Sequence, residues 1–135
     1  MIQKTNSEKE TMLFGEKLIK TFGSYKLFIL KGEVGAGKTV LVSGMAHALG
    51  INEKITSPSF AIKNQYLNLV HYDLYFAPKL KSREFNALIV EDLKDNIVVV
   101  EWGEKIVQRF LEKYILVKIT ISDDNQRIIQ VKERT

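Results

Sequence analysis

The chain has 135 residues, 45% of them hydrophobic, which is enough for one domain with a hydrophobic core and too short for two. The net charge of +4 permits an acidic partner such as RNA without requiring one, because the basic residues are spread along the chain. The absence of cysteine excludes disulfides and thiolate metal sites, and no apolar run resembles a signal peptide or a membrane span. We therefore expect a single cytoplasmic domain over residues 1–135, with neither a membrane nor DNA as a partner.

The first predicted element is a helix over residues 8–21. Ser7 and Glu10 form a capping box at its start, and apolar residues then recur at helical spacing. Gly23 predicts a left-handed end to this helix. Thr11 is in position to contact a nucleotide base, although its spacing alone favours an ordinary surface threonine.

Residues 32–39 match the phosphate-loop pattern G-x-x-x-x-G-K-[ST] at each of its four fixed positions. A buried strand is predicted at 26–31 and a helix from the loop to Leu49, closed by Gly50. The motif requires this order of strand, loop and helix, which argues against a glycine-rich turn with an incidental lysine. The residues of the loop are Gly32, Glu33, Val34, Gly35, Ala36, Gly37, Lys38 and Thr39.

The residue types of this loop indicate phosphate binding. Glycines allow successive backbone N–H groups to turn toward a phosphate, and the following helix adds the positive end of its dipole. Lys38 can reach the β- and γ-phosphates, and the Thr39 hydroxyl is placed to ligate Mg²⁺. The sequence therefore predicts that the chain binds a nucleoside triphosphate together with Mg²⁺.

Beyond this helix, the sequence predicts a β-hairpin, two short helices, one buried strand and a closing hairpin. The hairpin strands are expected at 60–66 and 69–72, the helices from Ser82 and over 104–111, the buried strand at 96–101, and the closing strands at 115–121 and 127–131. These elements predict an α/β fold, a three-layer P-loop NTPase-like domain with a mainly parallel central sheet and antiparallel hairpin additions. The nucleotide is expected at the carboxyl end of the strand at 26–31.

A phosphate loop needs a carboxylate on a neighbouring strand to hold Mg²⁺ or to orient the attacking water. Glu101 is the first candidate because it ends the run Val98-Val99-Val100, which would lie beside the strand at 26–31. The alternative is a glutamate at a strand end that faces solvent. Asp73 is the second candidate, and on spacing alone it could equally be a turn or capping residue. His71 points to the same side of the strand as Asp73, where a structural histidine is the simpler interpretation.

Four motifs in this order resemble the TsaE (YjeE) family of small bacterial P-loop ATPases, and the resemblance covers nearly the whole chain. The motifs are Gly35-Ala36-Gly37-Lys38-Thr39, Ser57-Pro58-Ser59-Phe60, His71-Tyr72-Asp73-Leu74-Tyr75 and Glu101-Trp102. The resemblance implies an ATPase required for threonylcarbamoylation of adenosine 37 in tRNAs that read codons beginning with A. It also implies TsaD and TsaB as partners, with tRNA met indirectly or within their complex. TsaD would perform the transfer, and the ATPase would reset or drive the complex between turnovers.

The resemblance also implies roles for single residues. Lys38 would bind phosphate, Thr39 would ligate Mg²⁺, Glu101 would be the metal-linked carboxylate, and Asp73 would act near the metal or the attacking water. The segment containing Ser57, Ser59 and Phe60 would be a switch over the γ-phosphate. Three further family positions near the nucleotide fall on Trp102, Thr11 and Arg127.

The chain departs from the family pattern at two positions. Ser59 replaces a threonine, which keeps a hydroxyl. Phe76 stands where the family commonly has arginine, which removes a donor for a phosphate or for a partner's carboxylate. Lys79 or Lys81 would substitute only in part.

Two other functions fit a phosphate loop. A small-molecule kinase would need an arginine-bearing lid over the transferred phosphate, and none of the four arginines follows a lid-like insertion. A nucleotide-gated binding module with incidental hydrolysis would instead use ATP to order the segments at 57–60 and 71–76. A GTPase is disfavoured because the sequence has no Asn-Lys-x-Asp motif.

Overall fold

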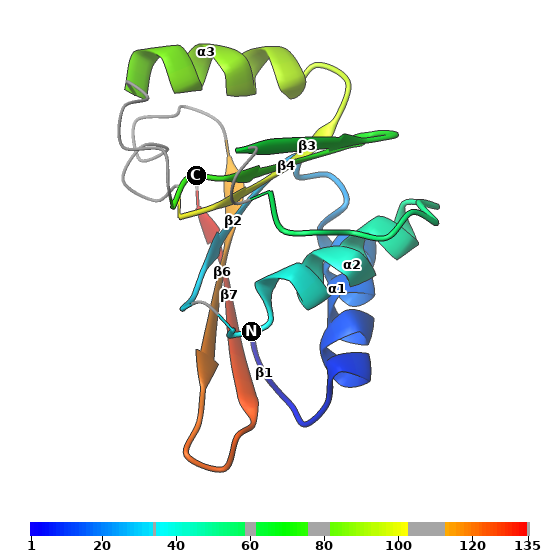
Figure 1. Cartoon of the computed structure of the whole chain (residues 1–135), viewed down its shortest axis with the longest axis vertical. Helices are drawn as coiled ribbons and strands as arrows, with labels where there is room; N and C mark the ends of the chain where they lie inside the picture. Colours follow the sequence, from blue (N-terminus) through cyan, green and yellow to red (C-terminus); the bar gives the residue numbers. More distant parts are fainter. Residues whose placement is uncertain (34, 59–61, 76–81, 103–112, 135) are drawn as a thin grey trace.

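The fold is built on a seven-stranded sheet with the strand order β1-β7-β6-β2-β5-β4-β3 (Figure 1). The computed structural model describes residues 1–33, 35–58, 62–75, 82–102 and 113–134. Its elements are β1 (Ile2–Thr5), α1 (Glu8–Phe22), β2 (Leu27–Lys31), α2 (Lys38–Ala48), β3 (Lys63–Tyr66), β4 (Leu69–Asp73), α3 (Ser82–Asp92), β5 (Ile97–Glu101), β6 (Tyr114–Ile121) and β7 (Arg127–Arg134).

The four middle strands are parallel, in the order β6, β2, β5 and β4. Antiparallel pairs extend the sheet on both sides, β3 beside β4 at one edge and β7 with β1 beside β6 at the other. In Figure 1, α3 lies on one side of the sheet, and α1 and α2 lie together on the other. The predicted three-layer fold, with a parallel centre and antiparallel hairpin additions, is confirmed.

Two hydrophobic clusters on opposite faces of the sheet form the core. Phe28 and Leu30 of β2 pack toward α1 and α2, while Leu27 and Ile29 pack on the side of α3. None of these four side chains is more than 1% exposed. Because β2 is buried on both faces, it reads as a continuous apolar run rather than an alternating one.

The phosphate-loop helix α2 is fixed against α1 by two glycines at their crossing. A Cβ at Gly44 would lie 1.9 Å from the Met12 carbonyl oxygen, and one at Gly15 would lie 2.2 Å from the Leu41 carbonyl oxygen. Real Cβ atoms do not come this close to backbone oxygens, so neither position tolerates a side chain without moving a helix. The close contact sets the position of α2, and with it the loop at its N-terminus.

The predicted helix ends are confirmed in two places and wrong in one. At the start of α1, the Glu10 backbone N–H donates to the Ser7 hydroxyl over 3.1 Å, as a cap requires. At the end of α2, Gly50 is left-handed with φ 80°. Gly23 is not, because its φ of −62° continues the right-handed turn beyond α1. A left-handed glycine was therefore the wrong prediction for the end of α1.

Strand β1 was not predicted. It is an edge strand of four residues whose first three side chains are exposed, so it carries no alternating pattern. Of the strand predicted at 60–66, residues 60 and 61 lie outside the described residues and β3 begins at Lys63. The helix predicted at 104–111 also lies outside the described residues. No described helix has the length and apolar character needed to cross a membrane.

Candidate nucleotide-binding site

The loop between β2 and α2 has the backbone that phosphate binding needs. Gly35 and Gly37 have φ of 86° and 105°, in the left-handed region that favours glycine. Gly37 caps α2 without a side-chain hydrogen bond, and the N–H groups of the first helical turn face the loop, where an anion can bind. Val34 lies outside the described residues.

A cavity of about 680 Å³ opens beside this loop, a volume typical of ligand sites. Its walls come from β1, α1, the phosphate loop, the ends of β4 and β5, and the turn before β7. The candidate site residues among its lining are Thr11, Gly35, Gly37, Lys38, Thr39, Ser57, Asp73, Glu101, Trp102 and Arg127. Side chains predicted from separate parts of the sequence therefore meet at one cavity.

Lys38 lies at the centre of the site and is only 7% exposed. Its ammonium donates a hydrogen bond to the Gly32 carbonyl oxygen and lies 3.9 Å from Glu101 Oε1. It also sits 4.0 Å from the centre of the Trp102 ring, in a cation–π contact. In this structure the lysine therefore contacts its own loop, a carboxylate and an aromatic ring.

Glu101 and Asp73 stand side by side at the carboxyl ends of two parallel strands. They are directly paired in the register of β4 and β5, and Glu101 is also paired with Leu30 of β2. They are 2% and 5% exposed, so Glu101 is not a solvent-facing strand end. Asp73 also has the turn role that its spacing allowed, because the Tyr75 N–H donates to its Oδ1 over 3.0 Å.

Ser57 joins the switch-like segment to these carboxylates. Its hydroxyl donates to Asp73 Oδ2 over 3.4 Å, and it lines the cavity. Ser59 and Phe60 lie outside the described residues, as do Phe76 and the nearby lysines Lys79 and Lys81.

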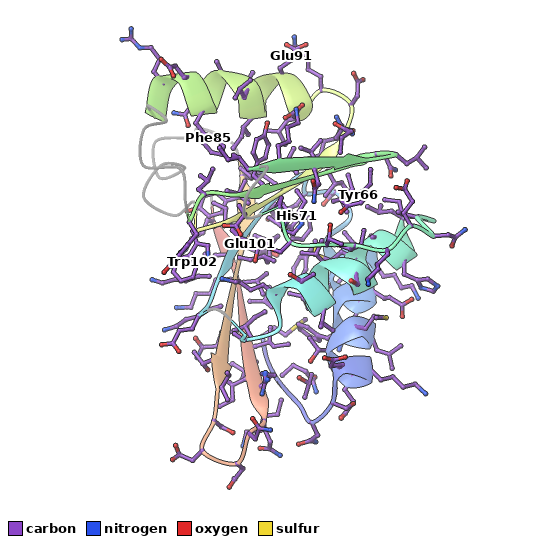
Figure 2. All side chains as sticks on the ribbon, viewed as in Figure 1. Tyr66, His71, Phe85, Glu91, Glu101 and Trp102 are labelled. Carbon is purple, nitrogen blue, oxygen red and sulfur yellow. The ribbon has the colours of Figure 1, made fainter. Side chains whose placement is uncertain are left out.

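His71 contacts the candidate carboxylate Glu101, which the sequence did not predict. It is fully buried, and its Nε2 lies 2.6 Å from Glu101 Oε2 (Figure 2). No hydrogen-bond partner for its Nδ1 is found among the described residues. A structural histidine was the simpler expectation. In the structure His71 is buried, and its hydrogen bond is to the candidate site residue Glu101. The sequence held one indication of this position. His71 and Asp73 are two residues apart on a strand, so their side chains lie on the same face.

Trp102 has a left-handed backbone with φ of 61°. This conformation is an outlier for a bulky residue, and such strain clusters at functional sites. Its ring packs against Tyr75 with centroids 5.0 Å apart, and its other ring contact is with Lys38. The tryptophan therefore lies beside the phosphate loop, in line with the resemblance.

Thr11 and Arg127 both lie at the cavity. Thr11 is 2% exposed, and its hydroxyl lies 2.7 Å from that of Thr5, so the surface threonine was the wrong expectation. Arg127 donates to two carbonyl oxygens of the phosphate loop, to that of Ala36 over 3.1 Å and to that of Gly35 over 3.4 Å. A contact of either residue with a nucleotide base stays a prediction.

The site fits a magnesium ion that is held partly by the nucleotide. No group of three His, Cys, Asp or Glu side chains within the described ranges is placed to hold a metal by itself. Mg²⁺ usually takes only one or two carboxylates together with phosphate oxygens and water. The pair of Asp73 and Glu101, together with Thr39 in the lining of the same cavity, matches that donor set.

These features define a nucleotide-binding protein of the P-loop class. Residues 5–129 match the family model described as "Threonylcarbamoyl adenosine biosynthesis protein TsaE". The chain belongs to the TsaE family, whose role is in the synthesis of threonylcarbamoyladenosine in tRNA.

Related proteins support this assignment across most of the chain. The tRNA threonylcarbamoyladenosine biosynthesis protein TsaE of Rickettsia typhi is 33% identical, over 95% of this chain and 92% of its own. The protein of the same name from Streptomyces coelicolor is 37% identical, over 78% of this chain and 75% of its own. The crystal structure of Bacillus subtilus YdiB superposes with a TM-score of 0.75 at 25% identity, covering 98% of this chain and 84% of that one.

Proposed function

We propose that residues 1–135 act as one domain that binds and hydrolyses ATP, with Mg²⁺, during threonylcarbamoylation of adenosine 37 in tRNAs that read codons beginning with A. The observation that carries this proposal is the pair of buried carboxylates, Asp73 and Glu101, at the strand ends beside the phosphate loop. A module that only bound nucleotide would need the loop but would not need two buried carboxylates next to it.

The loop and α2 bind the triphosphate in this proposal. The N–H groups at the start of α2 donate to phosphate oxygens, and Lys38 exchanges its contacts with Gly32 and Glu101 for the β- and γ-phosphates. Arg127 keeps the loop in its binding conformation through the two carbonyl oxygens that it holds.

Thr39, Glu101 and Asp73 would hold Mg²⁺, which when bound supplies positive charge to the phosphates. Their positions at the cavity wall also suit a second task. A carboxylate facing the cavity accepts a hydrogen bond from a water molecule and so orients it toward the terminal phosphate. Ser57, bonded to Asp73, connects this pair to the switch-like segment.

A single set of variants tests the proposal. Lys38→Ala is expected to abolish nucleotide binding, whereas Asp73→Asn and Glu101→Gln retain ATP and lose hydrolysis. Binding is measured by the emission of Trp102, the only tryptophan of the chain, which contacts Lys38. Hydrolysis is measured as phosphate release. Normal hydrolysis by Asp73→Asn would contradict the role given to Asp73.

We further propose that TsaD and TsaB are the partners and that the protein acts in the cytoplasm, where its tRNA is modified. Hydrolysis by the protein alone is then slow, and the partners change its rate because they complete the positioning of the site. Phosphate release is to be measured with and without TsaB, TsaD and tRNA. Efficient phosphate transfer to a small metabolite by the isolated protein would instead support a kinase and contradict the proposal.

A further inference from the structure

Basic side chains gather on the part of the sheet that α3 does not cover. In Figure 1, β6 and β7 extend away from α3, toward the end of the sheet that holds β1. On the side of α3, the strands β1, β6 and β7 and the end of β2 carry five exposed cations. We call this surface the basic sheet face, and its cations are Lys4, Lys31, Lys118, Lys132 and Arg134.

Strand register places all five on the same side. Lys31 is paired directly with Lys118 on β6, and Lys118 is paired with Gln130 on β7. Along β7, Lys132 lies two residues after Gln130 and Arg134 lies four residues after it. On β1, Lys4 is paired with Ile128, which lies two residues before Gln130. Paired residues share a face, and so do residues two apart on one strand. The intervening residues, such as Val117 and Ile129, point to the opposite side and pack in the core with α1 and α2.

Among the described strand residues of this face none is acidic, and the acidic residue Glu33 lines a cavity together with Lys31 and Lys118. Glu133 points to the other side of β7, Asp123 and Asp124 lie in the turn beyond β6, and Glu33 belongs to the phosphate loop. Within the described parts of the chain, no ion pair or side-chain hydrogen bond is found for any of the five cations.

The five cations of the basic sheet face outnumber the net charge of the protein, which is +4. The chain has 20 basic and 16 acidic residues. Without the five cations of this face, the remaining 15 basic residues are outnumbered by the 16 acidic ones. Cations that are far apart in the sequence therefore lie together on one side of the sheet.

The placement of Lys31 beside Lys118 does not serve the stability of the sheet. Like charges directly opposite each other on neighbouring strands are destabilising, and among the described residues neither lysine forms an ion pair. An anion bound between them would remove that repulsion. The pair therefore indicates a ligand that carries negative charge.

We propose that the basic sheet face binds the phosphate backbone of RNA. The five cations are spread over four adjacent strands that lie about 4.8 Å apart, and Lys132 and Arg134 lie about 6.7 Å apart along β7. This spread suits an extended row of phosphates rather than one small anion. The only aromatic side chain on this side of β6 and β7 is the half-buried Tyr114, so contacts come from charge and not from base stacking. The choice of tRNA as that RNA rests on the proposed function.

This face is joined to the nucleotide site by a second cavity. That cavity has a volume of about 430 Å³, and its lining includes Lys31, Lys118 and Trp102 as well as the acidic Glu33. Trp102 lines the nucleotide cavity as well, and Lys31 directly precedes the phosphate loop. RNA held by Lys31 and Lys118 would lie next to the loop, so bound RNA and bound ATP should change each other's affinity by the same factor.

The test compares two double variants of equal charge in the intact chain. Lys118→Gln with Lys132→Gln removes two cations from the basic sheet face, and Lys17→Gln with Lys20→Gln removes two exposed cations from α1. Binding of a fluorescent tRNA transcript is measured by anisotropy from 50 mM to 300 mM salt. Each lost phosphate contact lowers the slope of log affinity against log salt by about 0.7–0.9 and costs about tenfold in affinity at the lowest salt.

The face variant is therefore expected to lose about 100-fold in affinity at 50 mM salt and about 1.6 in slope, while the α1 variant stays near wild type. Equal affinities of the two variants, or no binding of tRNA by the wild type at 50 mM salt, would overturn the proposal. Unchanged tRNA affinity together with lost capture by TsaB and TsaD would assign the face to a protein partner instead, and would equally overturn it.

ATP turnover of the same variants without RNA separates this proposal from the proposed function. Neither pair of lysines lines the nucleotide cavity, so both variants should release phosphate as the wild type does. If the wild type does not hydrolyse ATP, the proposed function fails, while the anisotropy comparison still decides whether the face binds RNA.

Discussion

Replacing His71 tests whether Glu101 depends on a neighbour for its position. His71 is fully buried, and its Nε2 lies 2.6 Å from Glu101 Oε2. A hydrogen bond to a charged group contributes about 1.5–3 kcal/mol, and its loss leaves a buried carboxylate oxygen without that donor. We therefore expect His71→Leu to lower the free energy of unfolding by about 3 kcal/mol, which corresponds to a fall of about 10 °C in Tm.

The effect on catalysis separates a positioning residue from a purely structural one. His71→Leu should still bind ATP, because the phosphate contacts come from the loop and α2. Its hydrolysis should fall by roughly 100-fold, the loss expected when a catalytic group moves by about 1 Å. His71→Gln keeps an N–H donor at a similar reach and should restore most of the rate.

Urea denaturation, Trp102 emission and phosphate release supply the three readouts. A His71→Leu protein that is less stable but hydrolyses ATP at the wild-type rate would refute the positioning role. The role would also fail if His71→Gln were as stable as the wild type and as inactive as His71→Leu.

Three further variants test the scaffold around the site. Gly44→Ala should destabilise the protein by about 3 kcal/mol in urea denaturation, since its Cβ would meet the Met12 carbonyl oxygen at 1.9 Å; an effect below 1 kcal/mol would show that α1 and α2 separate easily. Arg127→Ala should weaken ATP binding about tenfold through the loss of its bonds to the phosphate loop; affinity equal to the wild type would contradict that role. Burial, together with the hydrogen bond to Asp92, raises the pKa of Tyr72 above the ordinary 10.0, so this tyrosine stays neutral in the folded protein when it ionises in the unfolded chain. Stability should then fall as the pH rises above 10.0, with a share from Tyr72 of at most about 1.4 kcal/mol per pH unit. Tyr72→Phe should lose less stability above pH 10.0 than the wild type, because it has no phenol to ionise in the unfolded chain. Identical dependence of the free energy of unfolding on pH in the two proteins would contradict the raised pKa of Tyr72.

The centre of the fold could be predicted because buried parallel strands leave a continuous apolar signal. The runs that became β2 and β5 are apolar on both faces, and the phosphate loop fixes the order of strand and helix. The edge strand β1 has no such signal, because three of its four side chains face solvent and its pairing partner β7 lies at the other end of the chain. Local patterns report burial, and the partner of an exposed edge depends on the whole topology.

The candidate site shows the same division. Glu101 and Asp73 could be found because each stands at the end of an apolar run, where parallel strands present their residues to one edge. Their direct pairing could not, since it depends on the register of β4 against β5. The burial of Thr11 also escaped prediction because it depends on β1, and Thr5 of that strand supplies its hydrogen-bond partner.

The contacts of Glu101 explain why the site needs a histidine as well as a lysine. One carboxylate oxygen lies 2.6 Å from His71, and the other faces Lys38 at 3.9 Å. If Lys38 turns to a triphosphate, as the proposed function requires, it leaves the second oxygen open toward the cavity. The first oxygen stays hydrogen-bonded to His71, because the His71 side chain is fully buried and cannot move with the lysine. In the proposed function, the direction of the freed oxygen would therefore be set before the nucleotide arrives, and bound ATP would meet a carboxylate that already faces the cavity.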